Sequence, residues 1–513
     1  MGSTPGKEED AALPPAVAGS LGETLWLNAW HFGRGVGAGS AERVLSHADL
    51  YRRGHRIAAG LAGLGITRDQ RIAMLAMNCV EMLEIYAAAE ISGIAIVPLN
   101  FRLSAAELAA ILRDSSPTLL FCEAQYAEMV ADLRGDIASL IHCIAIGPDF
   151  EDFVASAPAS VNWPPFADDA LACILYTSGT TGAPKGCMHS HRGFRAVGAL
   201  MTAKMGLTAS DRGLVMMPLF HMGGKAVQLG LHWSGGEMLI QRGFDPLAVL
   251  ETIARERITV THMAPTMIQT LLEHPDIDRF DLSSLRVIFY SAAPMPEPVL
   301  RRGLEKLGPV FIQSYGQTEI TGTVLPARCH RLDGTAMDRS HLTSVGIPPR
   351  GVEVRIEGED QVGEVLIRSP AAMSGYWNNP AATAETMRDG WVRTGDIGML
   401  DAEGFLFLID RKKDVIISGG ENIYSREVEN ALYAHPGISE AAVIGVPDAQ
   451  WGEAVCAIIV REPGSSIDAA AVIDHSRTLI AGYKRPRVVR FVEALPTLAN
   501  GKIEKKALRQ TTT

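Results

Sequence analysis

The sequence predicts an α/β protein with a large first domain and a small last one, and three observations support this class. Short apolar runs alternate with longer amphipathic runs through most of the chain, short turn-bounded strands begin near residue 352, and a compact mixed segment follows residue 412. Alternating β and α segments imply mostly parallel sheets covered by helices. We therefore predict a large N-terminal domain of mixed and parallel β-sheets with flanking helices and a small β subdomain, followed by a small α+β C-terminal domain.

The alternation begins near residue 71. An apolar run of about four to eight residues favours a strand, whereas a helix needs a longer stretch with helical periodicity. The expected strands are Arg71–Met77, Ile94–Pro98, Thr118–Cys122, Leu171–Tyr176, Gly213–Pro218, Glu237–Gln241, Ile258–Thr261, Leu285–Tyr290 and Val310–Gln313, and the expected helices include Val80–Ile91, Glu107–Arg113 and Pro246–Glu256.

The predicted β subdomain and the last domain do not follow the β–α alternation of the first part of the chain. Val352–Glu357 and Gly363–Arg368 are predicted as short strands bounded by turns. The last segment has fewer than about 110 residues, which is enough for a small domain with its own core. Its predicted helices are Ser425–Ala434 and Ile467–Leu479, and its predicted strands are Ala441–Val446, Val455–Val460 and Val488–Phe491.

Composition and charge exclude several classes of protein. The chain has 47 basic and 58 acidic residues, a net charge of −11, so no long-range attraction to nucleic acid or to an anionic membrane is expected. No stretch of about 18 uncharged apolar residues occurs, and no membrane-spanning helix is expected. The seven cysteines are widely spaced and lack zinc-ligand spacing, which favours reduced thiols in the cytoplasm.

The chain is predicted to have three parts. Residues 1–19 contain charges from Lys7 to Asp10 and no long apolar run, so they are predicted as a flexible leader and not a secretory signal. The charged run Asp410–Asp414 is predicted as a link between two folded bodies. The predicted boundaries are therefore 20–412 for the N-terminal domain and 413–513 for the C-terminal domain.

The strongest local signal is a loop rich in hydroxyls and glycines after the strand Leu171–Tyr176. Glycines let backbone N–H groups approach an anion, hydroxyls add donors, and a lysine adds positive charge. A plain glycine–serine turn is the alternative, but ten ordered positions with one lysine favour a polyphosphate site. It is not a Walker A loop, because Pro184 and Gly186 flank the lysine. The candidate ATP-binding residues here are Thr177, Ser178, Gly179, Thr180, Thr181, Gly182 and Lys185.

Four further segments stand in a fixed order after this loop: Pro218–His221, Ser314–Glu319, Gly390–Asp396 with Asp410–Arg411, and Asn500–Lys502. Together with Tyr176–Gly186 they resemble the motifs of the adenylate-forming superfamily, which includes acyl-CoA synthetases, peptide-synthetase adenylation domains and firefly-type luciferases. The resemblance spans about Leu21 to Leu508 and is strongest to the acid–CoA ligase branch. It implies that the small C-terminal domain is mobile.

The resemblance implies roles in nucleotide binding and catalysis. Tyr315 is expected to stack on the purine and Thr318 to donate to a phosphate oxygen. Glu319, a hard oxygen ligand, is expected to bind Mg²⁺ with Thr181. In isolation, turn-and-cap chemistry would be the simpler interpretation of Tyr315–Glu319.

The ribose and the reacting carboxylate have their own expected partners. By the same resemblance, Asp396 and Arg411 hold the ribose hydroxyls, and Lys502 holds the carboxylate of the acid and the α-phosphate. A positioned ammonium beside Mg²⁺ offsets the repulsion between two anions. Without the resemblance, these three residues are a turn aspartate, a surface arginine and a solvated lysine. The catalytic set predicted in this way is Lys502, Thr318, Glu319 and His221.

The acyl pocket is predicted from matching positions. His221 is expected to gate between the nucleotide and acyl pockets and not to carry a proton, although a core histidine is the simpler alternative. The surrounding residues are small, apolar or neutral, which favours an uncharged fatty, alicyclic or aromatic acid; Lys225 nearby leaves an acidic tail open. Ser291-Ala292 replaces the Gly-Gly or Gly-Ala of many relatives. The pocket residues are His221, Met222, Gly223, Ser291, Ala292, Ala293, Gly316 and Ile320.

The C-terminal domain is expected to bind CoA. Gly419 and Gly420 permit a narrow channel wall for the pantetheine arm, and three cations near residue 485 suit the CoA phosphates; a solvated basic turn is the alternative. Lys413 is implied as the pivot of domain rotation, although a plain linker would have the same composition. The remaining CoA residues are Trp451, Lys484, Arg485 and Arg487.

The predicted activity is that of an ATP-dependent carboxylic acid–CoA ligase that forms acyl-AMP and then acyl-CoA. It implies ATP, Mg²⁺ and CoA as cofactors or co-substrates and a small carboxylic acid as partner, with no nucleic acid; a homodimer is also considered. Three alternatives stay open: a ligase that loads a carrier protein, a luciferase-type oxygenase, and a non-enzymatic nucleotide-binding scaffold.

Overall fold

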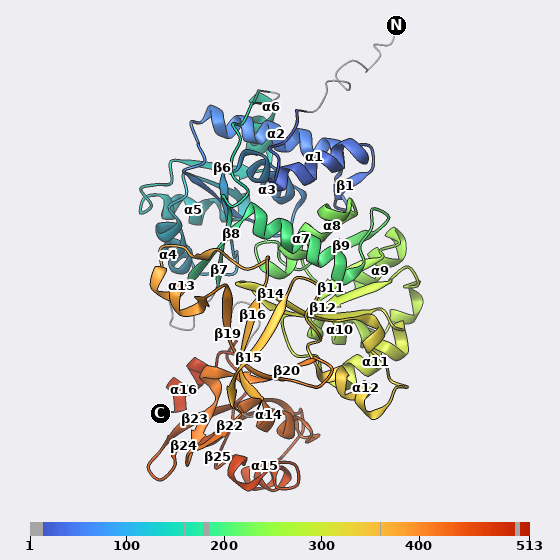
Figure 1. Cartoon of the computed structure of the whole chain (residues 1–513), viewed down its shortest axis with the longest axis vertical. Coiled ribbons are helices and arrows are strands. Elements are labelled where there is room, and N and C mark those ends of the chain that lie inside the picture. The colour runs from blue at the N-terminus through green and yellow to red at the C-terminus, as the bar shows by residue number, and fades with distance from the viewer. Residues whose placement is uncertain (1–13, 159–160, 178–183, 360, 498–502, 513) are drawn as a thin grey trace. The chain divides into compact units, whose positions relative to one another are not determined.

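The protein, seen here as a computed structural model, divides into two compact units (Figure 1). The structure describes residues 14–158, 161–177, 184–359, 361–497 and 503–512. The first unit comprises Met1–Glu353 and Arg368–Val392, and the second comprises Val354–Ile367 and Arg393–Thr513. The chain therefore passes three times from one unit to the other. The domain boundaries predicted after residues 19 and 412 stay predictions.

The larger sheet of the first unit has eight strands in the order β14-β13-β12-β11-β9-β10-β1-β2. The six inner strands pair in parallel, and only β2 and β14 at the edges are antiparallel. The strands are β1 (Val36–Gly39), β2 (Val44–Ser46), β9 (Arg212–Val215), β10 (Glu237–Ile240), β11 (Val260–Met263), β12 (Val287–Tyr290), β13 (Phe311–Gln317) and β14 (Ile320–Leu325).

The second sheet of this unit has seven strands in the order β17-β8-β7-β4-β3-β5-β6. Five of them, from β7 to β6, are parallel, and β8 and β17 are antiparallel additions. The predicted mixture of parallel and antiparallel sheets is confirmed. The strands are β3 (Arg71–Leu75), β4 (Ala95–Leu99), β5 (Leu119–Glu123), β6 (His142–Ile146), β7 (Leu171–Thr177), β8 (Lys185–Ser190) and β17 (Gly375–Tyr376).

Helices cover these sheets, and their starts are marked by local sequence signals. Ser104 and Glu107 form a capping box at the start of α4, and Asp245 with Pro246 starts α9. The apolar faces of α9, α10 and α11 pack on β9, β11, β12 and β13 in one core (Figure 1). The helices are α1 (Leu21–His31), α2 (His47–Gly63), α3 (Val80–Ser92), α4 (Ala105–Ser115), α5 (Ala127–Arg134), α6 (Pro148–Ser156), α7 (His191–Met205), α8 (Met222–Ser234), α9 (Pro246–Glu256), α10 (Pro265–Leu272), α11 (Glu297–Leu307), α12 (Ala336–Ser340) and α13 (Pro380–Thr386).

The remaining two sheets belong wholly or largely to the second unit. One has the order β15-β16-β19-β18 with β20 paired to β19, and the other has the order β22-β21-β24-β23 with β25 paired to β24. The elements are β15 (Glu353–Glu359), β16 (Val362–Arg368), β18 (Met387–Arg388), β19 (Trp391–Leu400), β20 (Leu406–Arg411), β21 (Ile416–Ser418), β22 (Glu421–Ile423), α14 (Ser425–Tyr433), β23 (Ile438–Asp448), β24 (Gly452–Arg461), α15 (Ala469–Ser476), β25 (Val488–Phe491) and α16 (Lys505–Thr512).

Most predicted elements occur within a few residues of their expected bounds, and one local expectation is wrong. The sequence predicts a turn at Thr394–Gly398, but β19 runs through this segment without interruption. Gly395 adopts a positive φ of 67° within the strand, and the register with β20 shifts just beyond it. Glycine tolerates this conformation at no steric cost, so the strand bends here and continues.

A search for membrane-spanning helices among the described residues finds none that is long and apolar enough to cross a bilayer.

Candidate active site

The base of the predicted phosphate loop is a β-hairpin. Thr177 at the end of β7 pairs with Lys185 at the start of β8, and the Thr177 hydroxyl donates to the Lys185 carbonyl at 3.4 Å. A Cβ at Gly186 would lie 2.7 Å from Ile174, so only glycine fits there. The predicted phosphate-binding residues Ser178, Gly179, Thr180, Thr181 and Gly182 lie outside the described residues.

Three side chains meet beside this hairpin. The hydroxyl of Tyr376 donates to Glu319 Oε1 at 2.8 Å, and the Lys185 ammonium lies 5.1 Å from the centre of the Tyr376 ring. Burial, together with the neighbouring Glu319, raises the pKa of Tyr376 above its ordinary value, so this phenol keeps its proton and its role as donor. The arrangement brings a carboxylate suited to Mg²⁺ and a cation suited to phosphate into one place.

Tyr376 is a site residue that the sequence analysis missed. It lies on the short strand β17, which pairs with β8 through Tyr376 and Cys187. The local signal is weak, because Gly375-Tyr376-Trp377 resembles an ordinary turn with aromatic residues. Only the pairing of β17 with β8, about 190 residues apart in the chain, reveals its position.

The segment predicted to bind the nucleotide base forms the hairpin of β13 and β14. Tyr315 is buried within β13, whereas Thr318 and Glu319 are half-buried at the turn. A Cβ at Gly316 would lie 2.8 Å from the carbonyl oxygen of Ile320. The hairpin therefore brings Tyr315, Gly316, Glu319 and Ile320 together, and what they bind stays a prediction.

Two of the predicted acyl-pocket segments meet through a residue that was not predicted, His262. His221 precedes α8 and its Nδ1 accepts from the Gly223 N–H at 3.2 Å. His262 Nε2 forms a hydrogen bond with the Ser291 hydroxyl at 2.8 Å, and a Cβ at Gly223 would lie 3.1 Å from the His262 ring. Burial, with His221 nearby, lowers the pKa of His262 to about 3, so the ring is neutral at physiological pH.

His262 carries a modest sequence signal, since it is the one ionisable residue of the apolar strand β11. Buried polar side chains usually have a partner or a function.

Ala292 belongs to the Ser291-Ala292 pair, which departs from the glycine-containing pattern of the family, and it adopts a positive φ of 74°. A side chain with a Cβ is strained in this conformation, so the loop after β12 holds a shape in which glycine would be more relaxed.

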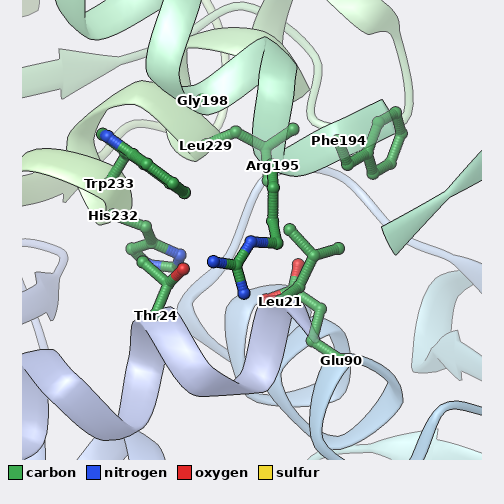
Figure 2. A pocket seen from close by; sticks show the side chains of 9 residues that line it. All are labelled: Leu21, Thr24, Glu90, Phe194, Arg195, Gly198, Leu229, His232 and Trp233. Atoms are coloured by element: carbon green, nitrogen blue, oxygen red, sulfur yellow. The ribbon is translucent and has the colours of Figure 1, made fainter. Parts of the chain in front are cut away.

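Lys225 does not offer a charge to an acidic substrate. Its ammonium pairs with Glu90 at 2.8 Å and lies 3.5 Å from the centre of the Tyr86 ring, with only 1% of the side chain exposed. Glu90 borders a cavity of about 10 Å³ lined by α1, α3, α7 and α8, which Figure 2 shows. That volume holds about one water molecule, and none of the predicted site residues lines it.

The predicted ribose pair is assembled in the second unit. Asp396 and Arg411 face each other across β19 and β20, and Arg411 Nε lies 2.6 Å from Asp396 Oδ1. Asp396 is 4% exposed. Its backbone N–H donates to Thr394 Oγ1 at 3.1 Å, which helps to set the direction of the carboxylate.

Part of the predicted CoA site is also assembled. Gly419 and Gly420 form the two-residue turn between β21 and β22, both with positive φ. A Cβ at Gly419 would lie 2.7 Å from the Trp451 ring, and the Arg487 guanidinium lies 4.3 Å from the ring centre of Trp451. No carboxylate in the described part of the chain pairs with Arg487, so its charge is available to an anion.

The other predicted cations of this region are already engaged. Lys484 donates to both oxygens of Glu427, at 2.7 and 2.8 Å. Although burial opposes it, this carboxylate raises the pKa of Lys484 above its ordinary value. Arg485 donates to the backbone carbonyls of Ile480 and Arg477. The predicted hinge residue Lys413 lies inside the second unit, in a short 3₁₀ turn, and its role as pivot stays a prediction.

Two predicted features lack a structural description. Lys502 lies outside the described residues. No group of three or more His, Cys, Asp or Glu side chains suited to a metal occurs among the residues that are described. A single carboxylate, Glu319, fits an ion that binds mainly to phosphate oxygens and water, as Mg²⁺ does.

The fold is the one expected of an adenylate-forming enzyme, and comparison with known families agrees. Residues 32–377 match the AMP-binding enzyme family, and residues 427–502 match the AMP-binding enzyme C-terminal domain. The chain belongs to the AMP-binding enzyme family.

Individual relatives share most of their length with this chain. A feruloyl-CoA synthase from an Amycolatopsis species is 38% identical over 91% of this chain and 94% of that protein. The fatty acid–[acyl-carrier-protein] ligase ScoC of Streptomyces coeruleorubidus is 34% identical over 91% of each protein. The crystal structure of ATP-bound MatB from Rhodopseudomonas palustris superposes with a TM-score of 0.87 at 30% identity, covering 96% of this chain and 98% of that one.

These findings confirm the predicted superfamily and the predicted class of enzyme, an AMP-forming acid–CoA ligase. ATP and CoA as substrates follow from the family.

Proposed function

We propose that this protein activates an uncharged aromatic or fatty carboxylic acid with ATP and transfers the acyl group to CoA. The observation that supports this proposal is the contact of Tyr376 with Glu319 beside Lys185, because a carboxylate suited to Mg²⁺ then lies near a cation suited to phosphate. The acid class rests on the neutral surroundings of His262 and on the pairing of Lys225 with Glu90.

In the first step, the carboxylate of the acid attacks the α-phosphate of ATP, and pyrophosphate leaves as acyl-AMP forms. Tyr315 stacks on the adenine, Thr318 donates to a phosphate oxygen, and Asp396 with Arg411 holds the ribose. Lys185 and Lys502 offset the repulsion between the two anions. Mg²⁺, held by Glu319 and Thr181, supplies further charge neutralisation when bound.

In the second step, the CoA thiol attacks the acyl carbon of the mixed anhydride, a thioester forms and AMP leaves. Gly419, Gly420 and Trp451 border the pantetheine arm, and Arg487 meets a CoA phosphate with help from Lys484 and Arg485. The C-terminal domain, residues 413–513, rotates about Lys413 between the two steps. This order needs no covalent acyl–enzyme intermediate.

A ligase that loads a carrier protein is the second candidate, and its support is the similarity to ScoC. Both activities share the first step and differ in the thiol acceptor. The exposed guanidinium of Arg487, which pairs with no carboxylate among the described residues, favours CoA, because CoA carries three phosphate groups. We also propose that the enzyme is cytoplasmic, in keeping with its widely spaced cysteines; the homodimer stays a prediction.

The experiment is a pyrophosphate-release assay over fatty, alicyclic, aromatic and dicarboxylic acids, each with and without CoA. Acid-dependent release followed by CoA-dependent AMP release supports the proposal. Thioester formation on a phosphopantetheinylated carrier but not on CoA selects the second candidate. Binding of ATP with no acid-dependent release would mean a nucleotide-binding scaffold, and a preference for dicarboxylic acids would contradict the neutral pocket.

A further inference from the structure

A buried lysine lies behind the strand that carries Tyr315. Lys204 is in the last turn of α7, and only 7% of the residue is exposed. Its ammonium donates to the Ser314 hydroxyl at 3.0 Å and to the carbonyl oxygens of Gly322 at 3.0 Å and Thr323 at 3.3 Å. All three acceptors belong to β13 or β14.

The two carbonyl acceptors belong to a β-bulge between β13 and β14, and Ser314 flanks this bulge. Ser314 pairs with Val324 and Gly316 pairs with Thr321, so one residue of β13 faces two residues of β14 between these pairs. The single residue is Tyr315, and the two are Gly322 and Thr323. A bulge leaves ladder groups unpaired and redirects the side chain beside it, and Lys204 donates to both carbonyls on the wider side.

Lys204 has no counter-ion. Its partners are a hydroxyl and two carbonyls, and no carboxylate in the described part of the chain pairs with it. Burial lowers the pKa of Lys204 to about 7, whereas the buried Lys225 is paired with Glu90. Burying a lysine without a carboxylate costs free energy, and the C-terminal end of a helix offsets only part of this cost. The hydrogen bonds to β13 and β14 are what this burial provides in return.

We propose that Lys204 is a positioning residue that holds Tyr315 in the orientation needed to bind the adenine, by supplying hydrogen bonds to the bulge opposite it. This inference rests on the proposed function, since it assigns the base to Tyr315. Ser314 takes part, because its hydroxyl accepts from Lys204 and donates to the Thr323 carbonyl at 2.9 Å. The network ties Ser314, next to Tyr315 on β13, to the two residues of β14 that face Tyr315.

The test is a double-mutant cycle on the full chain, with the dissociation constant of AMP measured by calorimetry. Lys204→Met keeps the length of the side chain but removes the donors, and we expect AMP to bind about tenfold more weakly. Tyr315→Ala also weakens binding. If Lys204 acts through Tyr315, Lys204→Met has little further effect in the Tyr315→Ala background, because the ring it positions is gone.

The matched control is Lys225→Met, which removes another buried lysine from the same unit. It should lower the melting temperature and leave the dissociation constant of AMP unchanged. If Lys204→Met does not fold, Ser314→Ala removes one member of the network and should show the same dependence on Tyr315 to a smaller degree.

The outcomes separate the two proposals. If the wild-type protein fails to bind AMP, the proposed function fails and this inference with it. Two outcomes overturn the inference alone and leave Lys204 with a merely structural role. In the first, Tyr315→Ala weakens AMP binding but Lys204→Met and Ser314→Ala do not. In the second, Lys204→Met or Ser314→Ala raises the dissociation constant of AMP by the same factor whether or not Tyr315 is present.

Discussion

The hydroxyl of Tyr376 orients the carboxylate of Glu319, the candidate metal ligand. It donates to Glu319 Oε1 at 2.8 Å from a strand that pairs with β8. A fixed donor on one carboxylate oxygen sets the direction of the other, as outer partners of metal ligands commonly do. Glu319 is thus oriented before any nucleotide arrives, which lowers the cost of ordering the site.

We expect Tyr376→Phe to slow acyl-AMP formation about tenfold, because a hydrogen bond to a charged group is lost. The Mg²⁺ concentration needed for half-maximal rate should rise, and acid-dependent pyrophosphate release over a Mg²⁺ titration measures both. Tyr51→Phe is the control, since that hydroxyl donates to the Pro14 carbonyl at 2.7 Å instead. Equal losses in both variants would contradict an orienting role for Tyr376.

Arg487 and Lys484 are predicted to differ in their effect on CoA although both are cations. Glu427 already neutralises Lys484, whereas Arg487 stacks on Trp451 with no carboxylate among the described residues. Arg487→Gln should raise the KM for CoA about tenfold, and Lys484→Gln should raise it less. Thioester formation at varied CoA checks this. A matching rise in the KM for ATP would show that the variant disturbs the fold and not the CoA site.

The turn between β21 and β22 shows how an element can shape a site through its backbone. Gly419 has a φ of 63°, its N–H donates to the Trp451 carbonyl at 2.8 Å, and the face where a Cβ would lie is filled by the Trp451 ring. Left-handed conformations favour glycine because other residues pay for the Cβ. The turn and the indole therefore fit only while residue 419 is glycine.

Gly419→Ala should impair thioester formation several-fold while sparing pyrophosphate release, because its Cβ would displace Trp451. Gly464→Ala is the matched control: φ is 83°, and nothing lies within 4 Å of its Cβ position. Both substitutions carry roughly 1 kcal/mol of backbone strain, so both should lower the melting temperature to a similar extent. If Gly464→Ala slows the CoA step as much, strain and not the contact with Trp451 is responsible.

At the scale of the whole molecule, the first unit contains an unusual set of buried neutral histidines. Burial lowers the pKa of His55 and His330 to about 4. Burial likewise lowers the pKa of the others to about 3; these are His189, His191, His232 and His262. In the unfolded chain each titrates near 6.5, so unfolding takes up protons as the pH falls.

The free energy of unfolding is therefore expected to fall as the pH drops from about 6.5 towards 4, because the unfolded state binds more protons in that window. Each histidine contributes up to about 1.4 kcal/mol per pH unit. Glu84 and Glu429, whose pKa values are raised by burial, act in the opposite direction, two groups against the six histidines. Calorimetric melting between pH 7.5 and 5 should show a steep loss of stability, and His55→Leu should reduce the slope by about one proton. A melting temperature that is flat over this range would contradict the buried neutral state.

The sequence predicts well those features that depend on short-range interactions, and it predicts poorly those that depend on distant partners. Strand and helix positions follow from short-range periodicity, so Pro246–Glu256 and Val488–Phe491 occur with the predicted bounds. Glu319 contacts Tyr376, which lies beside Lys185, and the sequence did not predict this contact. The interpretation of Asp396 as a turn residue was wrong, because Gly395 bends a strand instead of ending it.

The sequence alone determined the class of protein, since its hydroxyl- and glycine-rich loop and the motifs after it are local patterns of residue types. It could not place Tyr376, His262 or Lys204, because each acts through a partner far away in the chain. Lys225 is a further example. It is close to His221 in the sequence, but the sequence did not predict that Glu90 neutralises the charge of Lys225. Strand pairing and burial decide which charges stay available, and both depend on contacts that only the tertiary structure forms.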